Sequence, residues 1–272
     1  MVRTMALMLA LIGLFAAIGA LVADTTGTVI ALAIAVLVNA WTYFTANDGI
    51  LRAVGARDVT AADEPDLVAL VHELASAAGL PAPRVYLADT DEPNALSIGR
   101  APQYGGIVLT HGLLYGARLT ADEVAGVISH ELAHIKNRDP LTLAIASTIT
   151  SAILAFAGLF ALIGAAARRN GGIALALFGI VAMVAAWVLR LAIGRSREYA
   201  ADATGAAICG HPEWLASALR KLARHQLVEG RVEHLTLVPA FFVASLPDEW
   251  WARALDSHPP IERRIASLEA MR

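Results

Sequence analysis

The sequence has few charged residues for its length. Only 17% of its 272 residues are Asp, Glu, Lys or Arg, whereas 57% are hydrophobic. A typical soluble domain carries about 25% charged residues, which cover its surface. A fully water-soluble globule is therefore not expected. Intrinsic disorder is excluded, because disordered segments combine low hydrophobicity with high net charge.

A basic excess and cysteine pairs are also missing. The chain has 21 Lys and Arg against 24 Asp and Glu, a formal net charge of −3, and this balance does not favour a nucleic-acid partner. Cys209 is the single cysteine, which excludes an intramolecular disulfide framework and a zinc site built from cysteines. A metal site in this chain has to use His, Asp and Glu.

Long apolar runs are abundant in the sequence. Four uncharged runs are close to or above the about 20 residues that cross a bilayer, and they cover residues 5–23, 27–46, 141–167 and 171–189. They predict two transmembrane helices in residues 1–46 and a transmembrane hairpin in residues 141–190. The parts between and after them, residues 47–140 and 191–272, are polar.

The apolar runs also fit two alternatives to transmembrane helices. The first run is compatible with a cleaved signal peptide, although Leu21 and Ala23 make a poor small-x-small cleavage site. The second pair is compatible with a buried hairpin of a soluble protein, although uncharged runs of this length are rare in soluble cores. Four transmembrane helices account for both pairs.

Positive charges near the predicted spans indicate their orientation, because cytoplasmic loops are enriched in Lys and Arg. One side of the membrane has only Arg168 and Arg169, in the turn of the hairpin. The other side has Arg3, Arg52, Arg57, Lys136, Arg138, Arg190, Arg195 and Arg197. We therefore expect both termini and both polar parts to be cytoplasmic.

The polar parts predict helices around a small β-sheet. Helical spacing of apolar residues and flanking Pro and Gly predict helices at 65–78, 212–227 and 260–271. A short strand is predicted at 84–88, and two further strands are predicted at 94–100 and 106–110, on either side of a Pro/Gly turn. Thr120 and Glu123 form a capping-box pattern, which predicts a helix from there to about Arg138.

This capped helix contains the sequence His130-Glu131-Leu132-Ala133-His134. Two His residues four positions apart lie on one helix face, so both imidazoles can reach one ion. Glu131 lies about 100° around the helix, where it can take a proton from a zinc-activated water and give it to a leaving amine. The pattern is typical of metal-assisted peptide hydrolysis.

A second segment shows that the motif needs its context. Val71-His72-Glu73-Leu74-Ala75 is similar to residues 129–133, but Ser76 stands where the second His is needed. We therefore interpret His72 as a solvated helix residue.

A catalytic zinc site needs three protein ligands, and Glu198 is the candidate for the third. The predicted hairpin leaves the His helix and returns to the same membrane face just before Glu198. Asp202, one turn later, can accept a hydrogen bond from a ligating His. The alternative is a surface charge cluster of Glu198 and Asp202 with Arg195 and Arg197.

The order of these features resembles the HtpX-like membrane zinc metalloproteases, a gluzincin family that also contains the CaaX prenyl proteases. The similar features are the His130–His134 motif, the hairpin, the segment 195–202 and the late Ser257-His258-Pro259-Pro260. The resemblance covers nearly the whole chain. It implies one Zn²⁺ per chain, endopeptidase activity and an active site at the cytoplasmic face. The expected fold class is a mainly α membrane protein with four transmembrane helices and a cytoplasmic zincin-like domain with a small β-sheet.

Two further segments are similar to the family residue by residue. Residues 93–99 are similar to its edge strand, in which Asn94, Ala95 and Leu96 would bind an extended substrate by β-augmentation; the alternative is an ordinary strand and turn. In the C-terminal signature, His258 or Arg264 is expected to stabilise the oxyanion; the alternative is a helix N-terminus with surface charges.

The resemblance therefore predicts a zinc endopeptidase of the bacterial inner membrane that acts on membrane-protein or peptide substrates in quality control and stress response. The expected partners are the lipid bilayer and other membrane quality-control proteases, without nucleic acid. One alternative is a protease that cuts inside the bilayer, although charges at both ends of the His helix favour the water interface. Another is a non-catalytic scaffold, which would not need Glu131.

Overall fold

The computed structural model describes residues 47–142, 196–229 and 259–271, with isolated positions between 9 and 45 and position 180. Contacts divide the chain into two compact units, Met1–Phe44 with Thr142–Gly194 and Thr45–Leu141 with Arg195–Arg272. Three of the predicted transmembrane segments, 5–23, 141–167 and 171–189, fall almost entirely outside the described residues, and the segment 27–46 is described only at scattered positions. Among the residues that are described, no helix is both long enough and apolar enough to cross a membrane.

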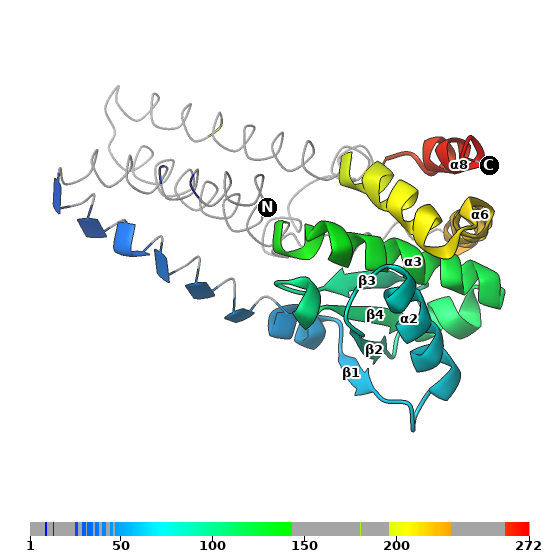
Figure 1. Cartoon of the computed structure of the whole chain (residues 1–272), viewed down its shortest axis with the longest axis horizontal. Coiled ribbons are helices and arrows are strands. Elements are labelled where there is room, and N and C mark those ends of the chain that lie inside the picture. Colours follow the sequence, from blue (N-terminus) through cyan, green and yellow to red (C-terminus); the bar gives the residue numbers. More distant parts are fainter. Residues whose placement is uncertain are drawn as a thin grey trace. The chain divides into compact units, whose positions relative to one another are not determined.

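A four-stranded mixed sheet forms one layer of the second unit (Figure 1). Its strands are β1 (Ala56–Val59), β2 (Arg84–Ala88), β3 (Ala95–Ile98) and β4 (Gly106–Thr110), in the order β1-β2-β4-β3. The central strands β2 and β4 are parallel, whereas the β1–β2 and β3–β4 pairs are antiparallel. β3 is therefore an edge strand, with one side bonded to β4.

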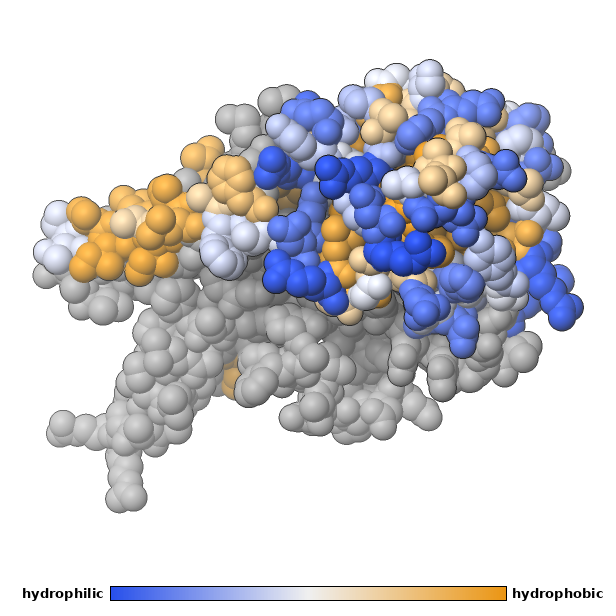
Figure 2. Space-filling view, turned by 90° about the horizontal axis from the view of Figure 1, so that it is seen from below, coloured by the Kyte–Doolittle hydropathy of each residue, from blue (hydrophilic) through white to orange (hydrophobic). Residues whose placement is uncertain are grey.

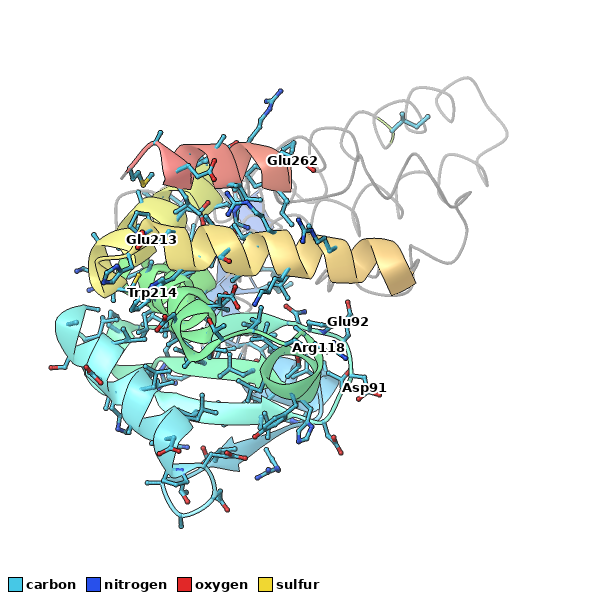
Figure 3. The ribbon with its side chains drawn as sticks, turned by 90° about the vertical axis from the view of Figure 1, so that its right-hand side faces the viewer. Asp91, Glu92, Arg118, Glu213, Trp214 and Glu262 are labelled. Atoms are coloured by element: carbon cyan, nitrogen blue, oxygen red, sulfur yellow. The ribbon has the colours of Figure 1, made fainter. Side chains whose placement is uncertain are left out.

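The longer helices of this unit are α2 (Pro65–Ala77), α3 (Ala121–Asn137), α6 (Pro212–Glu229) and α8 (Ile261–Glu269). α3 is the central element, because it contacts α2, β3 and β4 as well as α6, and α8 packs on α6. The sheet lies on one side of α3, and α6 and α8 lie on the other (Figures 1 and 3). Residues 196–209 form a further helical segment.

The two faces of the sheet are covered by different parts of the chain, because alternate residues of a strand point to opposite faces. Leu87 of β2 and Leu109 of β4 are fully buried in the main core, together with residues of α2 and α3. Tyr86 and Val108, one position away, form a second cluster against Ile50, Leu51 and Val54. Both faces are apolar, as the fully buried strand β4 requires.

Most of these elements match the sequence predictions. β2 and β4 have the predicted bounds, and α2, α3, α6 and α8 end close to the predicted positions. The strand predicted at 94–100 is shorter and ends at Ile98, because Gly99 leaves the extended conformation with a φ of 146°. β1 has no clear signal in the sequence: Arg57 and Asp58 are exposed and only Val59 is buried, so apolar alternation is missing.

α3 and α6 approach each other so closely that Gly126 has no room for a side chain. A Cβ atom on Gly126 would lie 2.6 Å from the backbone nitrogen of Leu215 and 2.9 Å from the carbonyl carbon of Trp214. Both atoms belong to the backbone at the start of α6, so they cannot turn aside like a flexible side chain. A substitution at Gly126 has to shift one helix against the other.

Gly126→Ala should therefore destabilise the protein by about 1–3 kcal/mol, the usual cost of overpacking a core. Gly49→Ala is the matched control, because Gly49 is also helical and nothing lies within 4 Å of its Cβ position. The control should melt at or slightly above the parent temperature, since Ala is the better helix former. Thermal unfolding in detergent measures both, and a G126A protein as stable as G49A would contradict the close packing.

Candidate metal centre

α3 is fixed at its start before it reaches the His residues. The predicted capping box is present: Thr120 Oγ1 accepts a hydrogen bond from Glu123 N, and Glu123 Oε2 accepts one from Thr120 N. Lys221 Nζ of α6 lies 2.7 Å from the same carboxylate. Burial raises the pKa of Glu123, but the hydrogen bonds from Lys221, Thr120 and Ser217 outweigh it and keep the pKa below its usual value. The charged Glu123 thus ties α3 to α6.

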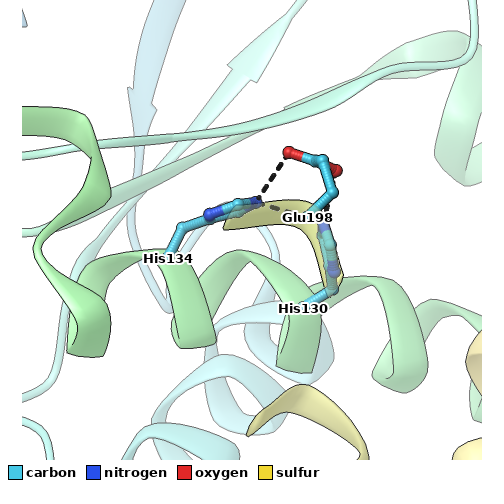
Figure 4. Close-up of side chains that lie close together, drawn as sticks. All are labelled: His130, His134 and Glu198. Atoms are coloured by element: carbon cyan, nitrogen blue, oxygen red, sulfur yellow. Dashed lines mark hydrogen bonds and ion pairs between the residues drawn. The ribbon is translucent and has the colours of Figure 1, made fainter. Parts of the chain in front are cut away.

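His130, His134 and Glu198 lie together, all three buried (Figure 4). The two Nε2 atoms are 3.1 Å apart. Glu198 Oε2 lies 3.6 Å from His130 Nε2, and Glu198 Oε1 lies 3.5 Å from His134 Nε2. Around a tetrahedral zinc ion with ligands at about 2.0–2.1 Å, neighbouring ligand atoms are about 3.3 Å apart. The distances and the N, N, O donor set therefore fit zinc.

A carboxylate holds the other ring nitrogen of each His. Asp202 Oδ1 lies 3.0 Å from His130 Nδ1, and Asp139 Oδ2 lies 2.8 Å from His134 Nδ1. With an ionised carboxylate as acceptor, each Nδ1 carries the proton and donates it, which leaves the Nε2 lone pair directed at the metal position. The contact between Asp202 and His130 is the one that the sequence predicts.

Asp139 makes a contact that the sequence did not reveal. The pattern assigns Asp139 to the stop signal after the His helix, together with Pro140. In the structure Arg138 adopts a left-handed conformation with a φ of 61° and ends α3. Asp139 then lies against His134. This contact depends on the left-handed conformation of Arg138. A positive φ is uncommon for a non-glycine residue, so the sequence does not predict it.

Two opposed effects set the protonation of His130. Burial lowers the pKa of His130, but the hydrogen bond with Asp202 and the interaction with Glu198 raise it to about 9. Burial also raises the pKa of Asp202, but the hydrogen bonds with Arg264 and His130 bring it below its usual value. A cation that binds at His130 Nε2 therefore has to displace a proton.

Arg264 reaches this centre from α8 and is buried. Its Nε donates to Asp202 Oδ2 over 2.9 Å and its Nη2 to Asp202 Oδ1 over 2.6 Å. Its Nη1 lies 3.2 Å from Glu198 Oε2. The guanidinium therefore contacts two carboxylates at once. One is Asp202, which lies against His130, and the other is the candidate ligand Glu198. A charge cluster on the surface, the alternative for Glu198 and Asp202, does not describe these buried side chains.

The other predicted site residues are placed differently. Glu131 is buried beside the His pair on α3. Ala95 and Leu96 are the first residues of the edge strand β3, which contacts α3, and Asn94 directly precedes them. His258 lies outside the described residues. The motif-like His72 of α2 is exposed, as predicted for a solvated helix residue.

Asp139→Ala should weaken zinc binding by about 10–100-fold, because it removes the group that orients His134. Asp89→Ala is the matched control, since Asp89 is an exposed carboxylate outside the centre. Competition with a chromophoric chelator measures both affinities. Equal zinc affinity in the two variants would show that the Asp139–His134 bond does not support the metal.

Comparisons with known proteins identify the family of the chain and a structure of similar fold. The sequence matches peptidase family M48 over residues 61–272. The crystal structure of S. mikatae Ste24p has a similar fold, with a TM-score of 0.58 at 17% identity. The similarity covers 97% of this chain but 61% of that one, so the chain spans only part of the length of that neighbour. Because the match extends over most of the sequence and includes both His residues, Glu198 and Arg264, the chain belongs to peptidase family M48.

Proposed function

We propose that the protein is a membrane-bound zinc endopeptidase that hydrolyses peptide bonds of membrane proteins at the cytoplasmic face. Membership of peptidase family M48 supports a metalloprotease activity. The observation that carries the proposal is the buried group of His130, His134 and Glu198, whose spacing fits one zinc ion. The substrate class, the membrane face and the role in quality control extend the family assignment.

In this proposal the residues of the site have different chemical roles. Zinc, when bound, would polarise the scissile carbonyl and make a water molecule more acidic. Glu131 accepts the proton of the attacking water and returns it to the leaving amine. Asp139 and Asp202 keep the two imidazoles in the correct tautomer and orientation. Arg264 holds Glu198 and Asp202, and in this proposal His258 or Arg264 stabilises the oxyanion.

The edge strand β3 offers a backbone surface for an extended peptide. Thr110 N donates to Asn94 O over 3.0 Å, so this pair is hydrogen-bonded. Bonded and non-bonded pairs alternate along an antiparallel ladder, and the backbone groups of Ala95 and Ser97 therefore point away from β4. A substrate strand would bond to these groups, with Asn94 and Leu96 beside it. This adds Ser97 to the residues that the sequence indicated.

The membrane part of the proposal rests on the sequence and on exposed apolar side chains. The four uncharged runs fit transmembrane helices. Large apolar side chains are exposed at the described positions Val29, Ile30, Leu37, Trp41 and Phe44 (Figure 2). Contiguous apolar surface of this kind marks contact with a membrane or another protein. The excess of Lys and Arg near one side supports a cytoplasmic active site.

Metal analysis combined with an activity assay tests the proposal. The purified protein in detergent should contain one zinc per chain and cleave fluorescently labelled casein. A chelator should abolish cleavage, and added zinc should restore it. A protein without bound zinc, or cleavage that continues in chelator, would contradict the proposal and favour a non-catalytic scaffold or another enzyme.

The proposed topology can be tested with single cysteines, because Cys209 is the only natural one. In a Cys209→Ser background, cysteines at Thr25 and Asn170 should react with an impermeant maleimide added to intact spheroplasts. Cysteines at Ala62 and Ala223, in the two cytoplasmic parts, should react only after lysis. Mass-shift gels measure the labelling, and external labelling of Ala62 would place the active site on the opposite face.

A further inference from the structure

A side chain takes the place of a backbone group where the edge strand begins. Leu109 of β4 pairs with Ala95, so the next pair of the ladder is Thr110 with Asn94. Asn94 N donates to Thr110 Oγ1 over 2.8 Å, the place that a backbone carbonyl takes in a regular ladder. The direction in which the chain enters β3 therefore depends on the hydroxyl of Thr110.

This hydroxyl uses its full bonding capacity on its neighbours. A threonine hydroxyl accepts two hydrogen bonds and donates one. Thr110 Oγ1 accepts from Asn94 N (2.8 Å) and Leu113 N (3.1 Å). Its proton has Glu92 O as the nearer acceptor (2.7 Å) and Asn94 O as the more distant one (3.1 Å). Thr110 is only 6% exposed. Without the hydroxyl, two backbone N–H groups would lose their acceptor in a place that water reaches poorly.

The loop of residues 90–94 is also pressed against the helical turn that follows β4, Gly112–Gly116. Gly112 N donates to Thr90 O over 2.8 Å. A Cβ atom on Gly112 would lie 2.0 Å from Asp91 O, so the loop lies directly on the glycine. Figure 3 places Asp91 and Glu92 together on this loop. Thr110 and Gly112 thus fix the loop from one side.

We propose that Thr110 is a positioning residue for the substrate. Its hydroxyl holds residues 92–94 and thereby sets the direction in which Asn94, Ala95 and Leu96 meet an extended peptide. Its hydrogen bonds go to this loop and to Leu113, and none goes to a residue of the metal centre. Thr110 therefore acts on peptide binding and leaves the hydrolytic step unchanged. The inference rests on the proposed function.

Thr110→Val and Thr110→Ser in the full-length protein test this role. Val keeps the shape of Thr but removes the hydroxyl, whereas Ser keeps the hydroxyl. With fluorescently labelled casein as substrate, T110V should raise KM on the order of tenfold. Its zinc content and kcat should stay within about twofold of the parent values. T110S should restore the parent KM.

Thr90→Val is the matched control, because it makes the same chemical change in the same loop. Within the described part of the chain, Thr90 Oγ1 accepts one hydrogen bond, a long one of 3.4 Å from Glu92 N, at an exposed position. T90V should therefore keep the parent KM. An unchanged KM in T110V, or a fall in kcat together with loss of zinc, would overturn the inference. If T110V does not fold, Thr110→Cys replaces it, and its weakly accepting thiol should still raise KM.

The same measurements separate this inference from the proposed function. A parent protein that binds no zinc and cleaves no casein overturns the proposed function itself. A parent that cleaves casein with bound zinc, while T110V keeps the parent KM, overturns only the role of Thr110.

Discussion

Replacing Glu131 by Gln should leave zinc bound and reduce peptide hydrolysis by about 10²–10⁴-fold, the usual contribution of a general base. Glu131 is buried beside the two His residues, but it does not belong to the group of candidate metal ligands, which are His130, His134 and Glu198. The amide has nearly the same shape but cannot accept the proton of water. Self-cleavage during purification should stop for the same reason. Casein cleavage and elemental analysis of the same sample measure the two effects.

The sequence itself supplies the matched control for this variant. Glu73 follows His72 in the motif-like segment of α2, and both side chains are exposed. Glu73→Gln therefore makes the same substitution in the same local sequence, without a metal centre beside it. E73Q should keep full activity. If E131Q cleaves casein at the rate of E73Q, Glu131 is not the base.

Replacing Glu198 by Ala should release zinc during ordinary purification, because two imidazoles alone do not make a catalytic zinc site. Elemental analysis should find far less than one zinc per chain. Glu262→Ala is the control, since Glu262 is an exposed carboxylate on α8, and it should keep its zinc. An E198A protein that retains one tightly bound zinc per chain would remove Glu198 from the ligand set.

Asp202→Ala should give a graded result that identifies it as a supporting group. It should weaken zinc binding by about 10–100-fold and leave activity recoverable with added zinc. The variant should also be less stable, by about 3–5 kcal/mol, because Arg264 keeps its buried charge but loses its main partner. Asp202→Asn retains an acceptor of the same size and separates the two effects. A D202A protein that binds zinc as tightly as the parent would show that Asp202 does not support His130 as a ligand.

The site could be predicted largely because its first elements are local. The capping box, His130, Glu131 and His134 lie within one helix, where a fixed rotation per residue determines which side chains share a face. Helix geometry alone therefore predicts the His pair. Glu198 and Asp202 required a second assumption, that the chain returns to the same place after residues 141–190, and the structure does bring both to the His pair.

The residues that the sequence placed least well depend on long-range contacts or on backbone conformations that no local sequence pattern predicts. Arg264 is 62 positions from Asp202, and no periodicity indicates that its guanidinium binds this carboxylate. Asp139 depends on one left-handed residue, and Thr110 on a hydroxyl that replaces a ladder group. The strand β1 shows the same limit, because its pairing with β2 defines it more than its own residues do.

The two arginines of the centre have a consequence for its overall charge. The carboxylates of Glu131, Asp139, Glu198 and Asp202 are all buried, and the guanidinium groups of Arg197 and Arg264 oppose them. With both His residues neutral, the group has an excess of two negative charges. A divalent ion makes the interior electrically neutral, which a monovalent ion does not achieve, and burial of a charged group without compensation is costly. The pKa of His130 is raised because of the same excess of negative charge. The charged groups of the centre therefore favour a divalent ion.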